Sequence, residues 1–272
     1  MAEGRLKRVA KRWVAPWRPR LMPDLLVIGA QKAGTSALFD MLVKHPAIVP
    51  PARKELGFFS DDTAYARGWS HYLQQLPLRP LRGRGWRTLD ATPSYLAHPR
   101  AAERIRHHLP DVRLVAVLRD PVKRAYSDWN MFRQLQDHPV NAHLHDPRSF
   151  EEAMQQELTM PLERTHYLQR GCYAPQLERY IGLFPKDRLL LFTYPNFKKD
   201  PEGVVRAILE HMGLEMPRFD APLREVRSNV RPYAEGIAPD MEERLRVFYA
   251  PHLAQLADLL GGMPDLDERS GH

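Results

Sequence analysis

The sequence predicts an α/β fold: a single domain with a central parallel β-sheet flanked by helices. Short apolar runs rich in leucine, valine and isoleucine alternate with longer segments in which apolar residues recur at helical spacing. The turns that follow these runs carry glycine, proline or charged residues. The chain has 272 residues, 43% of them hydrophobic, which is enough for one large domain with a sizeable core.

The first predicted strand covers residues 25–28, whose four apolar residues suit a buried parallel strand. A loop with Gly29, Lys32 and Gly34 follows, and helical spacing begins at Thr35. Such a loop presents the free N–H groups and the positive dipole end of a helix to an anion, and its lysine indicates phosphate. In a nucleoside-triphosphatase loop the lysine directly precedes Ser or Thr, which is not so here. A tight structural turn with a solvated lysine is the alternative.

The later elements follow in chain order. We expect strands over residues 86–89, 112–118 and 189–194, and helices over 61–76, 99–109, 121–135, 149–157, 173–184, 201–213 and 239–260. Asp120 suits the cap of the helix that begins at Pro121, and Pro251 is expected to interrupt the last helix. Ligands of parallel sheets lie at the carboxyl ends of the strands, so the loops after the first three strands should share one rim.

The net charge of +7 and the pI near 9.6 favour anionic ligands or surfaces without choosing among them. The chain is predicted to consist of a basic N-terminal arm over residues 1–22 and one domain over 23–272. Because tryptophans interleave with the arm's charges, peripheral membrane contact is one interpretation. An arm lying on the domain surface is the interpretation we favour.

No apolar run has the length expected of a signal peptide or a membrane span. Cys172 is the only cysteine, which excludes an intrachain disulfide and a cysteine-based metal site. We therefore expect a cytoplasmic protein. Histidines between residues 137 and 148 lack an obvious fourth ligand, so no metal is expected.

A second anion signal joins Arg119, at the end of the 112–118 strand, with Ser127, two turns into the next helix. A guanidinium fork and a hydroxyl suit a phosphate. A structural ion pair between Arg119 and Asp120 or Asp128 is the alternative.

A third signal is Glu55, which follows Lys54 and precedes two phenylalanines. A carboxylate in apolar surroundings can act as a general base, and a neighbouring cation such as Lys32 would keep it ionised. An ordinary surface charge pair is the alternative.

Together the three signals resemble the PAPS-dependent sulfotransferases, in particular heparan sulfate N- and O-sulfotransferases and their bacterial relatives. Residues 32–38 (Lys-Ala-Gly-Thr-Ser-Ala-Leu) are similar to the family's 5′-phosphosulfate loop, and residues 119–127 are similar to its 3′-phosphate motif. Residues 54–59 resemble the segment that carries the base, and residues 170–178 resemble a later motif. The resemblance covers most of residues 24–262.

The resemblance implies a P-loop-like sulfotransferase fold and in-line transfer of a sulfuryl group from 3′-phosphoadenosine 5′-phosphosulfate (PAPS) without a metal, with PAP as the product. Lys32, at the leaving phosphate, and Glu55, as base, would be catalytic, and backbone N–H groups of residues 33–36 would hold the 5′-phosphate. The residues expected to bind the donor are Gln31, Lys32, Ala33, Gly34, Thr35, Ser36, Arg119, Ser127, Tyr173 and Arg231. For Tyr173 a core role, and for Arg231 a plain surface role, stays open.

The acceptor is expected to be a carbohydrate or other small molecule with a hydroxyl or amine. Ala91 stands where heparan-type enzymes often carry a lysine, so a glycosaminoglycan is not implied and more charge stabilisation falls to Lys32. A small-molecule or nucleoside kinase is the alternative enzyme, and a non-enzymatic anion-binding module is a third interpretation. Basic residues beyond the arm lie at strand ends, so no nucleic acid is expected. The oligomeric state is open.

Overall fold

The structure is a computed structural model and describes residues 18–219, 221–226 and 236–268. Four strands form one parallel sheet in the order β2-β1-β3-β4, and they are β1 (Leu25–Gly29), β2 (Leu89–Ala91), β3 (Arg113–Leu118) and β4 (Leu189–Thr193). All of β1 and nearly all of β3 are buried, as their unbroken apolar runs predicted, whereas β4 at the edge is half-buried. The predicted α/β class with a central parallel sheet is confirmed.

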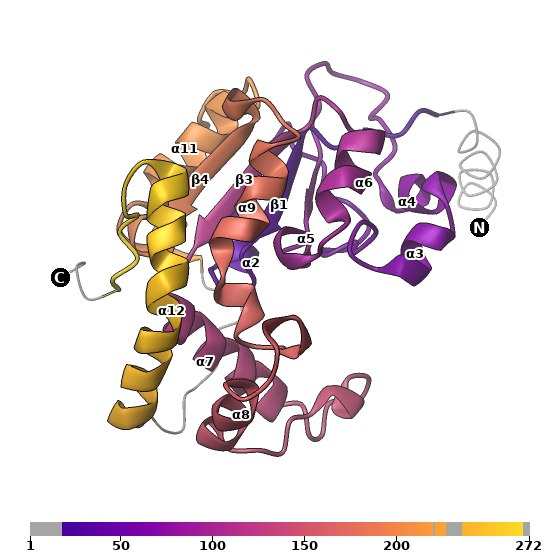
Figure 1. Ribbon diagram of the computed structural model, residues 1–272. Coiled ribbons are helices and arrows are strands. Elements are labelled where there is room, and N and C mark those ends of the chain that lie inside the picture. The colour runs from indigo at the N-terminus through magenta and orange to yellow at the C-terminus, as the bar shows by residue number, and fades with distance from the viewer. Residues whose placement is uncertain (1–17, 220, 227–235, 269–272) are drawn as a thin grey trace.

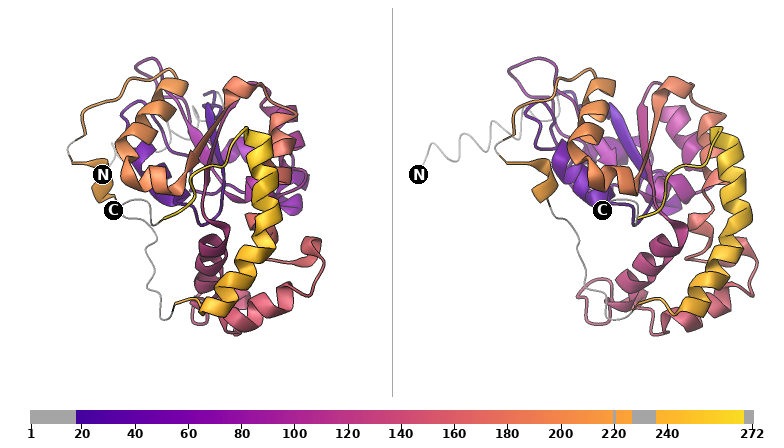
Figure 2. Two further views of the ribbon diagram at one scale, coloured as in Figure 1. Left: turned by 60° about the vertical axis from the view of Figure 1, so that its left-hand side comes forward. Right: turned by 90° about the vertical axis from the view of Figure 1, so that its left-hand side faces the viewer.

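The helices connect the strands and cover both faces of the sheet (Figure 1). In chain order they are α2 (Thr35–Leu42), α3 (Asp62–Ala66), α4 (Trp69–Gln75), α5 (Ser94–Ala97), α6 (Ala101–His108), α7 (Pro121–Arg133), α8 (Phe150–Glu157), α9 (Tyr173–Ile181), α10 (Tyr194–Lys199), α11 (Pro201–His211) and α12 (Pro239–Leu260). Helices α2 and α11 pack together on one face, and α9 packs with α12 on the other (Figures 1 and 2).

Two apolar cores divide the molecule. The larger core surrounds the sheet, and the smaller one lies between α7, α8 and the first half of α12. Tyr249 of α12 belongs to the smaller core and Leu256 to the larger, so this helix joins the two. The expected interruption at Pro251 is wrong: α12 is continuous through it. Packing on both sides of the proline outweighs the lost backbone hydrogen bond.

Other boundaries differ from the prediction for local reasons. The helix expected over 61–76 divides into α3 and α4 at Gly68, whose φ of +81° lies in the left-handed region. The strand expected at 86–89 is displaced and covers Leu89–Ala91. Two short helices that the periodicity did not reveal, α5 and α10, come within a few residues of the ends of β2 and β4. Both have too few residues for a periodic pattern to stand out.

Among the residues that the structure describes, no helix combines the length and apolar character required to cross a membrane. Residues 1–17 lie outside the described part of the chain. The division at residue 22 and the membrane contact of the basic arm therefore stay predictions.

Candidate functional site

The turn between β1 and α2 leaves a helix N-terminus without a side-chain cap. Gly34 is the N-cap residue and provides no side-chain cap hydrogen bond, and the first turn of the helix contains no acidic residue. The φ of Gly34, +84°, favours glycine, and a Cβ there would lie 3.0 Å from the Tyr194 ring. Lys32 also has a left-handed φ of +71°. The turn is therefore a compact cradle whose helix dipole is open to an anion.

One of the predicted backbone donors of this cradle makes a hydrogen bond within the turn. The Ala33 N–H donates to the Ala30 carbonyl at 3.2 Å, and the set of phosphate donors over residues 33–36 stays a prediction. Regular helical hydrogen bonding begins with the Leu38 N–H, which donates to the Gly34 carbonyl at 3.1 Å. The Thr35 side chain lies 4% exposed beneath the turn. Residues 34–36 are thus the backbone donors to consider for a ligand.

Lys54 connects the predicted base to this cradle. Its Nζ donates to Ser36 Oγ at 2.7 Å and to Glu55 Oε1 at 2.6 Å. The charge pair between Lys54 and Glu55 is therefore present, but it also extends to the start of α2. The predicted neighbouring cation was Lys32, whereas the cation that contacts Glu55 in the structure is Lys54. The sequence placed Lys54 beside Glu55 and gave no sign of its contact with Ser36.

A buried carboxylate anchors the segment that carries Glu55. The Gly57 N–H donates to Thr92 Oγ1 at 3.2 Å, and the Thr92 hydroxyl donates to Asp90 Oδ1 at 2.6 Å. Tyr72 and Tyr95 donate to Asp90 Oδ2 at 3.2 and 2.7 Å. Burial raises the pKa of Asp90, although these hydroxyl donors partly offset that effect. Sequence reasoning missed this anchor, whose only signal was an acidic residue in an otherwise apolar strand.

Arg119 lies beside the same cradle, at the end of β3. Its Nη1 donates to the Lys32 carbonyl at 2.9 Å, and its guanidinium carbon is 4.7 Å from the centre of the Tyr194 ring. Its Nε and Nη2 donate to the two carboxylate oxygens of Glu268 at 2.6 and 3.3 Å. Both side chains are largely buried, at 12% and 21% exposure. The contact with Lys32 brings the two predicted anion signals together.

The ion pairs suggested as alternatives for Arg119 are not the ones that form. Asp120 caps α7 by accepting from the Lys123 N–H at 2.8 Å. Asp128 accepts from Arg124 at 3.1 Å and from Arg170 at 3.0 Å. The partner of Arg119 is instead Glu268, 149 residues away in the chain, and nothing in the local sequence signals this contact.

Two further residues predicted to bind the donor, Ser127 and Tyr173, are largely buried. Ser127 is 8% exposed on α7, next to Asp128. Tyr173 is 1% exposed and donates its hydroxyl to the Arg119 carbonyl at 2.8 Å, and burial raises its pKa to about 12. Tyr173 therefore lies in the core and holds the Arg119 backbone, and a role in donor binding stays a prediction.

The amide oxygen of Gln31 is buried and has no hydrogen-bond partner among the described residues. The side chain of Gln31 lines a cavity of about 10 Å³, together with Arg170 and Gln176. A cavity of this size has room for about one water molecule. Arg231 lies outside the described residues, so its role stays a prediction.

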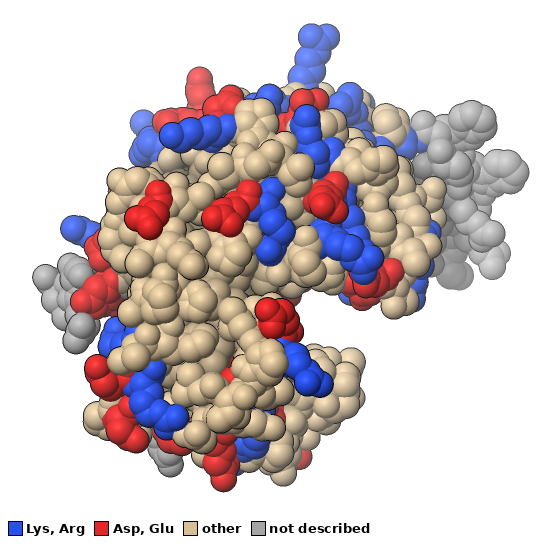
Figure 3. Space-filling view, viewed as in Figure 1, with Lys and Arg blue, Asp and Glu red and all other residues tan. Residues whose placement is uncertain are grey.

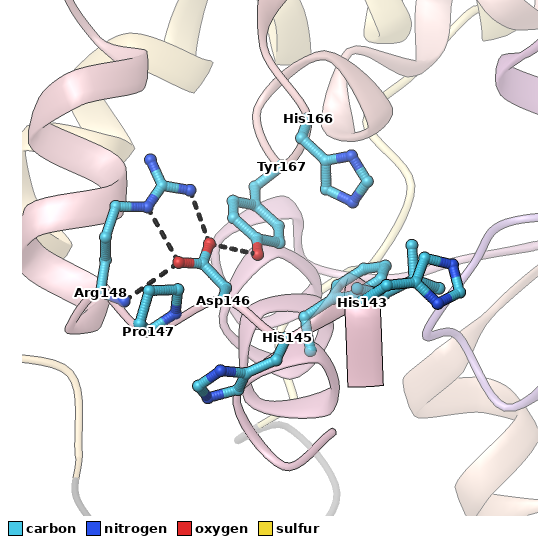
Figure 4. A pocket seen from close by; sticks show the side chains of 9 residues that line it. His143, His145, Asp146, Pro147, Arg148, His166 and Tyr167 are labelled. Carbon is cyan, nitrogen blue, oxygen red and sulfur yellow. Dashed lines mark hydrogen bonds and ion pairs between the residues drawn. The ribbon is translucent and has the colours of Figure 1, made fainter. Parts of the chain in front are cut away.

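A separate pocket of about 360 Å³ lies near the far end of α7 (Figure 4). Within it Asp146 accepts from Arg148 Nε at 2.9 Å and from the Tyr167 hydroxyl at 2.8 Å. Burial alone would raise the pKa of Asp146, but the bonds from Arg148 and Tyr167 lower it to about 2. Burial and nearby arginines lower the pKa of His166 to about 4, so this imidazole is neutral at pH 7.

The histidines of this region do not gather as metal ligands do. In the described part of the chain, no group of three or more His, Cys, Asp or Glu side chains is arranged to hold a metal ion. The labelled His143 and His145 side chains point in different directions in Figure 4. His45, at the end of α2, is structural: its Nε2 lies 3.0 Å from the Glu215 carbonyl.

Figure 3 shows that the surface is deeply notched between the sheet-containing half and the helical half. Lysine and arginine side chains are interspersed with acidic ones on the face shown, and no broad area of a single charge stands out. This face therefore lacks the basic stripe typical of nucleic-acid binding.

Comparison with known proteins identifies the family of this chain. Residues 22–231 match the family model of the sulfotransferase domain. Mouse heparan sulfate glucosamine 3-O-sulfotransferase 3B1 is 29% identical over 262 residues, which cover 88% of this chain and 64% of that protein. Human bifunctional heparan sulfate N-deacetylase/N-sulfotransferase 3 is 29% identical over 209 residues, 73% of this chain and 23% of that protein. This chain spans slightly less than two thirds of the first of these relatives.

Solved structures agree with the sequence relatives. A sulfotransferase from Alicyclobacillus acidocaldarius aligns with a TM-score of 0.68 and 26% identity over 89% of this chain and 96% of that one. A mouse sulfotransferase crystallised with PAP aligns with a TM-score of 0.52 and 14% identity over 85% of this chain and 84% of that one, a likeness of fold.

Proposed function

This chain belongs to the sulfotransferase family, and on that premise we propose that it transfers the sulfuryl group of PAPS to a hydroxyl or amine of a small acceptor. The observation that carries the proposal is the convergence of three basic residues, together with Glu55, on one helix N-terminus that has no side-chain cap. Lys32 lies in the turn, Lys54 joins Glu55 to Ser36, and Arg119 contacts the Lys32 carbonyl.

The 5′ side of the donor is assigned to the turn before α2. Backbone N–H groups of residues 34–36, with the hydroxyls of Thr35 and Ser36, would hold the 5′-phosphate at the positive end of the helix dipole. Gly34 supports this assignment, because the left-handed turn and the close approach of Tyr194 disfavour a side chain at this position. Lys32 would bond the oxygen that bridges phosphorus and sulfur and stabilise its developing charge.

The 3′ side is assigned to Arg119, which precedes α7, and to Ser127, two turns into that helix. A guanidinium can form two parallel hydrogen bonds to a phosphate, and the Ser127 hydroxyl adds a donor. Tyr173 would act indirectly by holding the Arg119 backbone. Gln31, Ala33 and Arg231 remain predicted neighbours of the donor.

In the proposed step, the acceptor oxygen or nitrogen forms a bond to sulfur while the bond from sulfur to the bridging oxygen breaks. Glu55 takes the acceptor proton, and the electron pair of the broken bond leaves with the 5′-phosphate of PAP. No electron transfer takes place, and the charge on the leaving group is met by Lys32 and the α2 N-terminus. Lys32 and Glu55 are therefore the proposed catalytic residues.

The acceptor is proposed to be a carbohydrate or another small molecule. The names of the relatives refer to heparan sulfate, which supports carbohydrate as a class. Position 91 carries a fully buried alanine on β2, so this chain has no lysine side chain there to contact a heparan-type acceptor.

The kinase alternative has less support, because the carboxylates near the strand ends are poorly available as ligands for Mg²⁺. Magnesium at a phosphate site needs available carboxylates. Asp90 is fully buried with three hydroxyl donors, and Asp120 caps α7 and lies 3.6 Å from Arg246. Both carboxylates, one within β2 and one just after β3, are thus engaged in the protein.

Titration calorimetry tests the proposal. We expect adenosine 3′,5′-bisphosphate to bind at least about tenfold more tightly than adenosine 5′-monophosphate, because Arg119 and Ser127 contact only the former's 3′-phosphate. ATP with Mg²⁺ is the comparison for a kinase. Tight ATP binding together with indifference to the 3′-phosphate would overturn the proposal.

Glu55→Gln tests the base. The substitution keeps the shape and removes the proton acceptor, so we expect kcat to fall roughly 10²- to 10⁴-fold while the Kd for the bisphosphate changes little. Sulfate transfer from labelled PAPS, with acceptors screened on the wild-type protein, gives the first quantity, and calorimetry gives the second. Near-normal turnover would place the base elsewhere.

A further inference from the structure

The segment that carries Glu55 is fixed at one end by Asp90 and at the other by a lysine. Thr92 holds the Gly57 N–H and is itself held by the buried Asp90. Glu55 has a φ of +60°, an unusual conformation for a residue with a side chain, so surrounding contacts must maintain it. Beyond this anchor the Glu55 side chain is 51% exposed and is oriented by its contact with Lys54.

Lys54 occupies the position between the base and the donor cradle. Its Nζ lies 2.6 Å from Glu55 Oε1 and 2.7 Å from Ser36 Oγ, and its side chain is only 21% exposed. A carboxylate that must approach an anionic phosphosulfate is repelled by it, and a cation between the two offsets that repulsion. The fully buried Ala91 cannot provide such a charge.

We propose that Lys54 is a positioning residue that holds the Glu55 carboxylate at the N-terminus of α2 and supplies the positive charge that position 91 lacks. This inference rests on the proposed function. Lys54 takes no proton in the step: Glu55 accepts the acceptor proton, and Lys54 stays an ammonium throughout. The contact with Ser36 makes the placement of the base depend on the same helix turn that holds the 5′-phosphate.

Lys54→Met tests the positioning role of Lys54, because methionine keeps most of the length of the side chain and removes its positive charge. We expect kcat to fall roughly 10- to 100-fold, while the Kd for adenosine 3′,5′-bisphosphate changes less than about threefold. Lys54→Arg keeps the charge and should recover part of the loss. Lys44→Met is the matched control, since Lys44 is an exposed lysine just beyond the other end of α2, and it should leave kcat unchanged.

A double substitution separates positioning from a general structural role. If Lys54 acts through Glu55, then Lys54→Met should lower the residual rate of the Glu55→Gln protein by no more than about threefold. Independent, multiplicative losses would overturn the inference. A Lys54→Met protein with the kcat of the wild type would also overturn the inference. A wild-type protein that fails to bind the bisphosphate would instead contradict the proposed function, so the two failures are distinguishable.

Discussion

Two neighbouring strand-to-helix turns offer phosphate sites in different ways. The turn from β1 to α2 has a glycine N-cap and no side-chain cap, so its helix N-terminus is open. In the turn from β3 to α7 the N-cap residue is Asp120, whose carboxylate accepts from the Lys123 N–H, and Pro121 has no N–H to offer. The first turn can bind an anion through the backbone, whereas the second depends on the side chains of Arg119 and Ser127.

The charge balance of the two turns also differs. The first helical turn of α2 contains no acidic residue. At the α7 turn, the Arg119 guanidinium is already paired with Glu268 from the C-terminal segment. A phosphate arriving at α2 meets an open helix dipole, while a phosphate arriving at Arg119 must share or displace a carboxylate. The 5′ side should therefore carry the chemistry, and the 3′ side should tune affinity.

The largest effect expected from the comparison of the two turns tests the chemical role of the 5′ side. Lys32→Ala should lower kcat roughly 10²- to 10³-fold, because the charge on the leaving phosphate loses its side-chain donor. Single-turnover transfer from labelled PAPS measures this, and Lys44→Ala is the control for general loss of a lysine. If only the KM for PAPS rises, then Lys32 is a binding residue. The conclusion that the 5′ side carries the chemistry would then be wrong.

The next effect concerns the stability of the 3′ side. Burial raises the pKa of Asp128, but Arg124 and Arg170 outweigh burial and bring it below its ordinary value. A lowered pKa gives stability that is present above about pH 4 and lost as the pH falls through the folded-state pKa. Asp128→Asn should therefore cost about 3 kcal/mol at pH 7, with a smaller difference from wild type at pH 3.5.

Urea unfolding at pH 7, 5 and 3.5 measures this difference. Asp137→Asn, at an exposed position just beyond α7, is the control and should show no such trend. Should Asp128→Asn fail to fold, Arg170→Met is the alternative variant. It removes one of the two arginines that bind Asp128, and the Arg170 side chain is 25% exposed. A stability difference that stays constant with pH would show that Asp128 does not contribute through its charge.

Arg119→Ala tests the 3′ side by affinity. We expect the Kd for adenosine 3′,5′-bisphosphate to rise roughly 10- to 100-fold, with much less change for the 5′-monophosphate, because only the former has a phosphate for the guanidinium to bind. Arg133→Ala, at the exposed C-terminal end of α7, is the control. Equal losses for both nucleotides would mean that Arg119 acts by holding the Lys32 loop rather than by binding the 3′-phosphate.

The smallest expected effect has the opposite sign. Glu268→Gln removes the negative charge at Arg119 without shortening the side chain, so the bisphosphate should bind roughly three- to tenfold more tightly. Asp265→Asn removes a nearby exposed charge and should have little effect. If Glu268→Gln weakens binding, then the carboxylate orients Arg119 for the ligand, and the two turns differ less than their charges indicate.

Much of the fold could be predicted because its signals are local. The apolar runs gave the three longer strands, and Asp120 with Pro121 gave the start of α7, since caps and buried strands depend on residues close in sequence. The continuity of α12 through Pro251 could not be predicted in this way. It depends on contacts with two separate cores.

The candidate site divides along the same line. The sequence by itself determined the cradle at Gly34, the pair of Lys54 and Glu55, and Arg119 at a strand end, because each is a short pattern with a fixed physical meaning. Only the tertiary structure decided that Lys54 reaches Ser36, that Asp90 anchors the Glu55 segment, and that Glu268 occupies Arg119. The bonds from Lys54 to Ser36, from Gly57 to Thr92 and from Arg119 to Glu268 join residues 18, 35 and 149 positions apart, and no local pattern encodes which distant groups the folded chain brings together.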